Sequence, residues 1–176
     1  MEVYDAIMKR RSIRKYIDRD IPKEEIFKIA KAGIMAPSAS NFQPWSFLFV
    51  TDENLIKKIG EGLQGFISEA RLIIVGTYDK NVNKSWNVVD TAISLQNMVL
   101  YCTSAGLGTC WVGAFNKKRV RQLCNIPESH EILALITVGF ADPSFPTGNY
   151  FRKDLEDTFF NNTWDEPFPG FENLEV

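Results

Sequence analysis

Four runs of apolar residues along the chain have the length and composition of β-strands. They are rich in Val, Ile, Phe and Thr and are bounded by polar or turn-forming residues, which is the pattern of strands. The predicted strands cover residues 46–51, 71–78, 109–114 and 131–140. The run at 71–78 is apolar enough to occupy the centre of a sheet.

Between these runs, apolar residues recur with the spacing of helices. The predicted helices cover residues 2–10, 22 to about 36, 52–63, about 85–102 and 116–123. Pro22 suits the first turn of the second helix, and Asp52 is placed to cap the third. Gly106 and Gly108 follow the fourth helix, and we assign both to its C-terminal stop.

The helix predicted at 85–102 is unusual because it is apolar on nearly every face from Val88 to Cys102. We therefore expect it to be buried on all sides. A monomer of this size could hide such a helix, but an interface between two subunits would do so more naturally.

No repeat, low-complexity tract or linker interrupts the chain, and 176 residues fit one domain. We predict a single α+β domain over residues 1–157. Residues 158–176 carry aromatic residues and prolines without periodicity, and they hold too many aromatics for a solvated, disordered end. We expect this extension to lie across a surface, plausibly that of a partner subunit.

Composition narrows the possible functions. The chain has 20 Lys and Arg against 22 Asp and Glu, a net charge of −2 and a pI near 5.5, which argues against nucleic-acid binding. No stretch reaches the roughly 18–20 apolar residues of a membrane span, and no signal region is visible. Three cysteines without metal-site spacing indicate a reducing cytoplasm. The single histidine, His130, argues against a histidine-based metal site, so an enzyme of this sequence would rely on a cofactor.

A cationic cluster follows the first predicted helix. Arg10, Ser12 and Arg14 would come together as the chain turns into an extended segment. Guanidinium groups with a hydroxyl suit a multiply charged anion such as a phosphate. A solvated charge run is the alternative, and the cluster alone does not exclude it.

Three motifs in order make the chain resemble the FMN-dependent nitroreductase family, in its compact form. They are R-R-S-I-R-K-Y at 10–16, A-P-S-A-S-N-F-Q-P-W at 36–45 and G-L-G-T-C-W-V-G at 106–113. Arg152 and Lys153 add a later cationic pair. The resemblance covers nearly the whole chain.

The resemblance implies an FMN site without a catalytic side chain or a metal. The implied cofactor-binding residues are Arg10, Arg11, Ser12, Arg14, Pro37, Ser38, Ser40, Asn41, Gln43, Cys110, Trp111, Val112, Gly113, Arg152 and Lys153. The arginines and Ser12 would hold the phosphate and ribityl chain. Residues 37–45, a loop rich in hydroxyls and amides (the amide loop), would approach the isoalloxazine, much of it from the other subunit. Gly113 would let the backbone come close to the ring. We interpret Cys110 as a small buried residue rather than a reactive thiol.

The resemblance also implies a fold and a reaction. The family fold is a three-layer α+β sandwich with a mostly antiparallel sheet, in a homodimer that exchanges C-terminal segments and holds the flavins in its interface. The implied reaction is ping-pong hydride transfer from NADH or NADPH to a nitroaromatic, a quinone or a similar conjugated acceptor. Two alternatives stay open: a flavin-binding or storage protein without meaningful turnover, and a member with dehalogenase or other flavin chemistry. No inserted helices that would roof the flavin are visible, so the substrate-facing wall is unassigned.

Overall fold

The computed structural model describes residues 1–148 and 151–170. The chain forms two compact units, Met1–Phe145 and Pro146–Val176, and each is described by itself. The predicted boundary after residue 157 stays a prediction. Across the described ranges, no helix is both long enough and apolar enough to cross a membrane.

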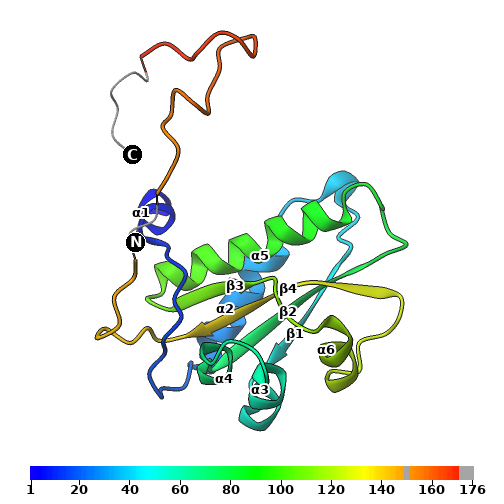
Figure 1. Ribbon diagram of the computed structural model, residues 1–176. Coiled ribbons are helices and arrows are strands. Elements are labelled where there is room, and N and C mark those ends of the chain that lie inside the picture. Colours follow the sequence, from blue (N-terminus) through cyan, green and yellow to red (C-terminus); the bar gives the residue numbers. More distant parts are fainter. Residues whose placement is uncertain (149–150, 171–176) are drawn as a thin grey trace. The chain divides into compact units, whose positions relative to one another are not determined.

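The first unit is built on a four-stranded sheet in the order β1-β2-β4-β3 (Figure 1). The strands are β1 (Trp45–Val50), β2 (Leu72–Asp79), β3 (Gly108–Val112) and β4 (His130–Gly139). All three neighbouring pairs are antiparallel. The four strands predicted from the apolar runs are confirmed, and β2 lies in the interior of the sheet as its composition indicated.

Helices cover both faces of the sheet (Figure 1). One face packs against α2 (Lys23–Ile34) and α5 (Asn87–Ser104), and the other packs against α3 (Glu53–Gly60), α4 (Phe66–Glu69) and α6 (Lys117–Leu123). The short α1 (Val3–Lys9) packs against α5. The fold is therefore the three-layer α+β sandwich expected from the resemblance.

The continuous apolar run of β2 follows from this double cover. Successive strand residues point to opposite faces, so Ile73 and Val75 join the core beneath α3, α4 and α6. Leu72 and Ile74 join the core beneath α2 and α5. All four side chains are fully buried.

The predicted helix at 52–63 differs from the structure. Asp52 does cap α3, since its Oδ1 accepts the Leu55 N–H at 2.7 Å, but the helix ends at Gly60 and a second helix, α4, follows. Gly62 has a φ of +75°, a conformation that glycine adopts readily and that breaks the helix. The sequence did not indicate α4 because it is only four residues long.

The expectation that α5 is buried on all sides is wrong for the single chain. Val88, Val89 and Ile93 are 43%, 42% and 37% exposed, because no other element of the first unit covers this face. Their exposure leaves an apolar surface along the helix.

The assignment of both glycines to the end of α5 is half right. Gly106 has a φ of +76°, as a glycine at a helix end commonly has. Gly108 is instead the first residue of β3, and the position that a Cβ would take there is only 2.8 Å from Ile13 Cγ1. The absent side chain leaves room for another segment.

The C-terminal unit holds local contacts of its own. Phe160 pairs with Pro167 in an isolated bridge and stacks on Trp164, with 4.7 Å between the ring centroids. Asn161 Nδ2 donates to Glu166 Oε1 at 3.1 Å. The expectation that residues 158–176 pack on a partner subunit stays a prediction, and residues 171–176 lie outside the described part.

Candidate functional site

The segment that follows α1 runs beside β3. Ser12 forms a parallel bridge with Thr109, and the Ile13 N–H donates to the Thr109 carbonyl at 2.8 Å. Further along, Tyr16 pairs with Ala141, just beyond the end of β4. The cationic cluster is thus held in an extended conformation against the edge of the sheet.

Tyr16 anchors this segment. Its hydroxyl lies 2.8 Å from Thr137 Oγ1 and donates to the Ile13 carbonyl at 2.8 Å. Burial raises the pKa of Tyr16 well above its ordinary value, although the hydrogen bond with Thr137 and the charge of Arg14 oppose that shift. The phenol is therefore neutral over the physiological range, and its hydrogen bonds to Ile13 and Thr137 hold the segment in place.

The cluster residues influence the ionisation of Cys110 of β3. Burial raises the pKa of the Cys110 thiol, while the charge of Arg14, a hydrogen bond from Ser12 and the charge of Arg10 act in the opposite direction. Cys110 is 2% exposed, so it is a buried thiol, as interpreted from the sequence. Ser12 lies directly beside β3 through its bridge with Thr109, and the charges of Arg10 and Arg14 are felt at the neighbouring Cys110.

Arg11 is oriented differently from its neighbours. Its guanidinium donates to the carbonyls of Met8 at 2.7 Å and Arg10 at 2.9 Å. These bonds satisfy backbone groups at the end of α1, where a cation is favoured by the helix dipole. In the described structure, Arg11 stabilises the helix end.

The amide loop that follows α2 has an uncommon backbone. Ser40, Asn41 and Gln43 have φ values of +50°, +55° and +47°, a region that residues other than glycine seldom occupy. Pro37 precedes the loop and is exposed. Ser38 Oγ accepts the Gln43 N–H at 3.0 Å. The backbone therefore turns sharply in the loop for which the resemblance implies a flavin contact.

Asp90 of α5 also holds this loop, and sequence reasoning missed it. Its Oδ1 accepts the Ala39 N–H at 3.1 Å, and the residue is 1% exposed. An acidic residue within an otherwise apolar helix was the available signal, because a buried carboxylate needs hydrogen-bond donors.

The chain is open to solvent just beyond the end of β3. Val112 is buried, and the half-buried Trp111 donates from Nε1 to Gln96 Oε1 at 3.3 Å. Gly113 follows the strand and is exposed, with no atom within 4 Å of the position that its Cβ would take. A flat ligand could approach the backbone there.

Arg152 and Lys153 belong to the C-terminal unit, and both are exposed. The Arg152 guanidinium donates to the neighbouring Phe151 carbonyl at 3.1 Å. Their expected approach to the cationic cluster stays a prediction.

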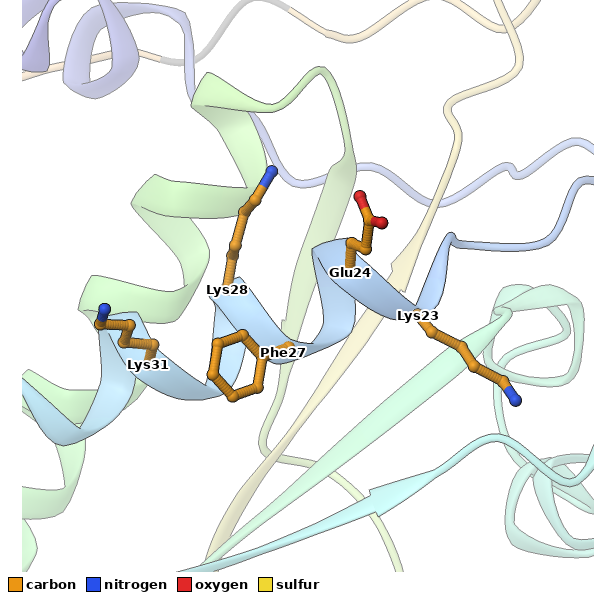
Figure 2. A pocket seen from close by; sticks show the side chains of 5 residues that line it. All are labelled: Lys23, Glu24, Phe27, Lys28 and Lys31. Atoms are coloured by element: carbon orange, nitrogen blue, oxygen red, sulfur yellow. The ribbon is translucent and has the colours of Figure 1, made fainter.

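Among the hollows elsewhere on the first unit, one lies on α2 and another beside β1. One, of about 570 Å³, is lined by side chains of α2 alone: Lys23, Glu24, Phe27, Lys28 and Lys31 (Figure 2). The side chains in Figure 2 spread along the helix and do not converge on one point. The other, of about 280 Å³, lies beside β1 and includes Ser46 and His130. Among the described residues, no group of three or more His, Cys, Asp or Glu could hold a metal ion.

Comparisons with known proteins agree on one family. A model described as the Nitroreductase family matches residues 7–71 and 60–140. A protein of Archaeoglobus fulgidus, provisionally named NADH dehydrogenase/NAD(P)H nitroreductase, is 35% identical over 149 residues, which cover 79% of this chain and 85% of that protein. An iodotyrosine deiodinase of Thermotoga neapolitana is 25% identical over 82% of this chain and 92% of its own length.

A solved structure extends this likeness to three dimensions. The FMN-dependent nitroreductase of Clostridium difficile R20291 has a TM-score of 0.80 and 30% sequence identity. The superposition covers 91% of this chain and 99% of that structure.

Proposed function

The chain belongs to the nitroreductase family, and from this premise we propose that it is an FMN-dependent NAD(P)H oxidoreductase that reduces nitroaromatic, quinone or similar conjugated acceptors. The observation that carries the proposal is the anchoring of the cationic cluster on β3, where Ser12 bridges to Thr109. The charges of Arg10 and Arg14 and the Ser12 hydroxyl also act on the same buried thiol, Cys110.

The chemistry of these donors fits the phosphate of FMN. Arg10 and Arg14 carry permanent positive charge, and the Ser12 hydroxyl supplies a further donor. Arginine is well suited to phosphate because its planar fork can make two parallel hydrogen bonds. We assign phosphate binding to these three residues, with Arg152 and Lys153 closing on the same group.

The amide loop and the end of β3 fit the flavin ring. Ser38, Ser40, Asn41 and Gln43 offer donors and acceptors that match the carbonyls and N–H of the pyrimidine edge. The open space at Gly113 would admit the ring against the backbone. Trp111 and Val112 hold this backbone in place.

When bound, FMN would supply hydride acceptance and donation, which side chains of this protein cannot supply. The protein's contribution is binding, orientation and electrostatic stabilisation. The reductant and the acceptor would use one site in turn, so a separate nucleotide-binding domain is unnecessary. No acid–base pair is assigned.

The position of the single histidine agrees with this view. His130 is the first residue of β4, and seven positions along the strand separate it from Thr137, the cross-strand partner of Cys110. At about 3.3 Å per residue, the two backbone positions are roughly 23 Å apart. We therefore assign no role in phosphate binding to His130.

A second copy of the chain would complete the enzyme. The exposed apolar face of α5 continues at α1, where Val3, Tyr4 and Ile7 are 74%, 71% and 50% exposed. Apolar surface of this extent is typical of subunit interfaces. We propose a homodimer with flavins in its interface and exchanged C-terminal segments. All three cysteines are free thiols, which supports an enzyme of the cytoplasm.

Two readouts separate this proposal from its alternatives. The purified protein should be yellow or should become yellow with FMN, and NADH or NADPH should bleach it without oxygen. A storage protein would bind FMN but would not be reduced at a useful rate. Deiodination of iodotyrosine faster than reduction of nitroaromatics or quinones would favour the dehalogenase alternative, which the name of the Thermotoga relative motivates.

A further inference from the structure

Asp90 is a buried carboxylate that the proposed chemistry does not use directly. It lies in the first turn of α5 and is 1% exposed. Its Oδ1 accepts the Ala39 N–H at 3.1 Å, whereas its Oδ2 has no hydrogen-bond partner in the described structure. A buried carboxylate with an oxygen in this state is costly, so its presence needs an explanation.

The loop held by Asp90 needs an external support. Ser40, Asn41 and Gln43 all have positive φ, and such backbone persists only where its surroundings enforce it. Of the hydrogen bonds described for residues 38–43, the others stay within the loop, such as Gln43 N–H to Ser38 Oγ and Gln43 Nε2 to Asn41 Oδ1. The bond from Ala39 to Asp90 is the one that reaches a helix.

Asp90 is suited to this task by its charge and position. A hydrogen bond from a backbone N–H to a carboxylate is roughly twice as strong as one between neutral groups. The first turn of a helix also favours negative charge, because the macrodipole is positive there. Asp90 is thus placed to hold the loop through its bond to Ala39.

We propose that Asp90 is a positioning residue that fixes the amide loop for contact with the flavin ring. The inference rests on the proposed function, because it concerns the same flavin site. It assigns Asp90 to the ring and leaves the phosphate to the cationic cluster. The two groups can therefore be distinguished with a flavin that lacks the phosphate.

The test measures the dissociation constants of FMN and riboflavin for the purified full-length protein. Asp90→Ala should weaken both flavins by the same factor, about tenfold to a hundredfold, because the lost bond supports the ring contacts. Arg14→Ala should weaken FMN much more than riboflavin. Asp90→Asn keeps one acceptor oxygen and should recover about half of the loss on a logarithmic scale.

Two further variants keep the test interpretable. Thr91→Val is the matched control, because Thr91 is equally buried and its hydroxyl donates only to the Asn87 carbonyl within α5; it should leave both affinities unchanged. If Asp90→Ala does not fold, Asp90→Leu supplies a larger apolar side chain with the same branching at Cγ and replaces it in every comparison.

Hydrogen exchange of the flavin-free protein gives a readout that does not depend on the cofactor. The amides of residues 38–43 should exchange faster in the Asp90 variants and at the wild-type rate in Thr91→Val. If wild type binds flavin but the Asp90 variants bind both flavins equally well, the inference is wrong and the proposed function stands. If the wild type binds no flavin, the proposed function fails. If the amides of the loop exchange at the same rate in the Asp90 variants as in the wild type, the positioning role is wrong.

Discussion

Gly108 and Gly139 face each other as cross-strand partners in β3 and β4. Opposite residues of an antiparallel pair share one face of the sheet, and here neither has a side chain. Ile13 lies 2.8 Å from the place that a Cβ of Gly108 would take, and Tyr16 lies 2.8 Å from the equivalent place at Gly139. The absence of side chains at these two glycines thus lets the segment 10–16, which carries the cationic cluster, pack closely against β3 and β4. We call this glycine pair the seat of the segment.

Replacing Gly108 by alanine should disturb this seat. The added methyl group would overlap Ile13, and overpacking of this kind costs about 1–3 kcal/mol. We expect Gly108→Ala to lower the free energy of unfolding by that amount in urea titrations, and to weaken FMN binding at the same time. Gly65→Ala is the control, because Gly65 has a φ of −53° and open space at its Cβ position. If Gly108→Ala binds FMN as tightly as the wild type, the close packing at Gly108 does not support the binding site.

Arg14→Ala tests the assignment of the phosphate site. The loss of a charged hydrogen bond should weaken FMN binding by about 1.5–3 kcal/mol, which fluorescence titration can measure. Riboflavin has no phosphate, so its affinity should change far less. Arg19→Ala serves as the control, since the Arg19 guanidinium lies over the Phe140 ring at 4.0 Å and has no part in the proposed site. Equal losses for FMN and riboflavin would show that Arg14 does not contact the phosphate.

The strands were predictable from sequence because each apolar run is bounded by turn residues and β2 is covered on both faces. The helix that leads into an extended segment at Ser12 was also predictable, from the apolar spacing and the motif that follows it. The close packing of this segment against Gly108 was not predictable, because Gly108 approaches Ile13, a residue 95 positions earlier in the chain.

Two other features needed coordinates for different reasons. The positive φ values of Ser40, Asn41 and Gln43 fall on residues other than glycine, and of the three only asparagine favours this region, so the local signal is weak. The burial of Asp90 depends on where the loop packs. The exposed face of α5 is the reverse case. Its apolar pattern is plain in the sequence, but the sequence does not show that the single chain leaves this face uncovered.

The exposed face of α5 predicts the effect of a charge at Ile93, which is 37% exposed. If a second copy covers this face, Ile93→Asp loses apolar burial and adds a charge that must be desolvated. The dimer dissociation constant should rise at least about tenfold, as measured by analytical ultracentrifugation. Gln122→Asp, on α6 at the other side of the sheet, should have no such effect. A wild-type protein that sediments as a folded, yellow monomer at micromolar concentration would refute the dimer.

Tyr16 predicts how stability changes at high pH. Its pKa is raised in the folded protein, so the unfolded chain loses this proton at lower pH than the folded one. The contribution of the protonated Tyr16 to the free energy of unfolding is therefore complete below about pH 10, the ordinary pKa of tyrosine. It is lost as the pH rises further, at up to about 1.4 kcal/mol per pH unit. Tyr16→Phe should flatten this decline and lower the free energy of unfolding at pH 7 by about 0.5–1.5 kcal/mol, because the bonds to Thr137 and Ile13 are lost. If the free energy of unfolding of Tyr16→Phe falls equally steeply at high pH, groups other than Tyr16 cause the decline.

Anaerobic titration of the FMN-loaded protein with NADH and with NADPH, followed by absorption, tests the central claim most directly. The account predicts that at least one of the two reductants bleaches the flavin band within seconds, and that a nitroaromatic or quinone acceptor then restores it. A protein that takes up no FMN, or that holds FMN without being reduced by either nucleotide, would contradict the claim that this chain is a flavin-dependent oxidoreductase.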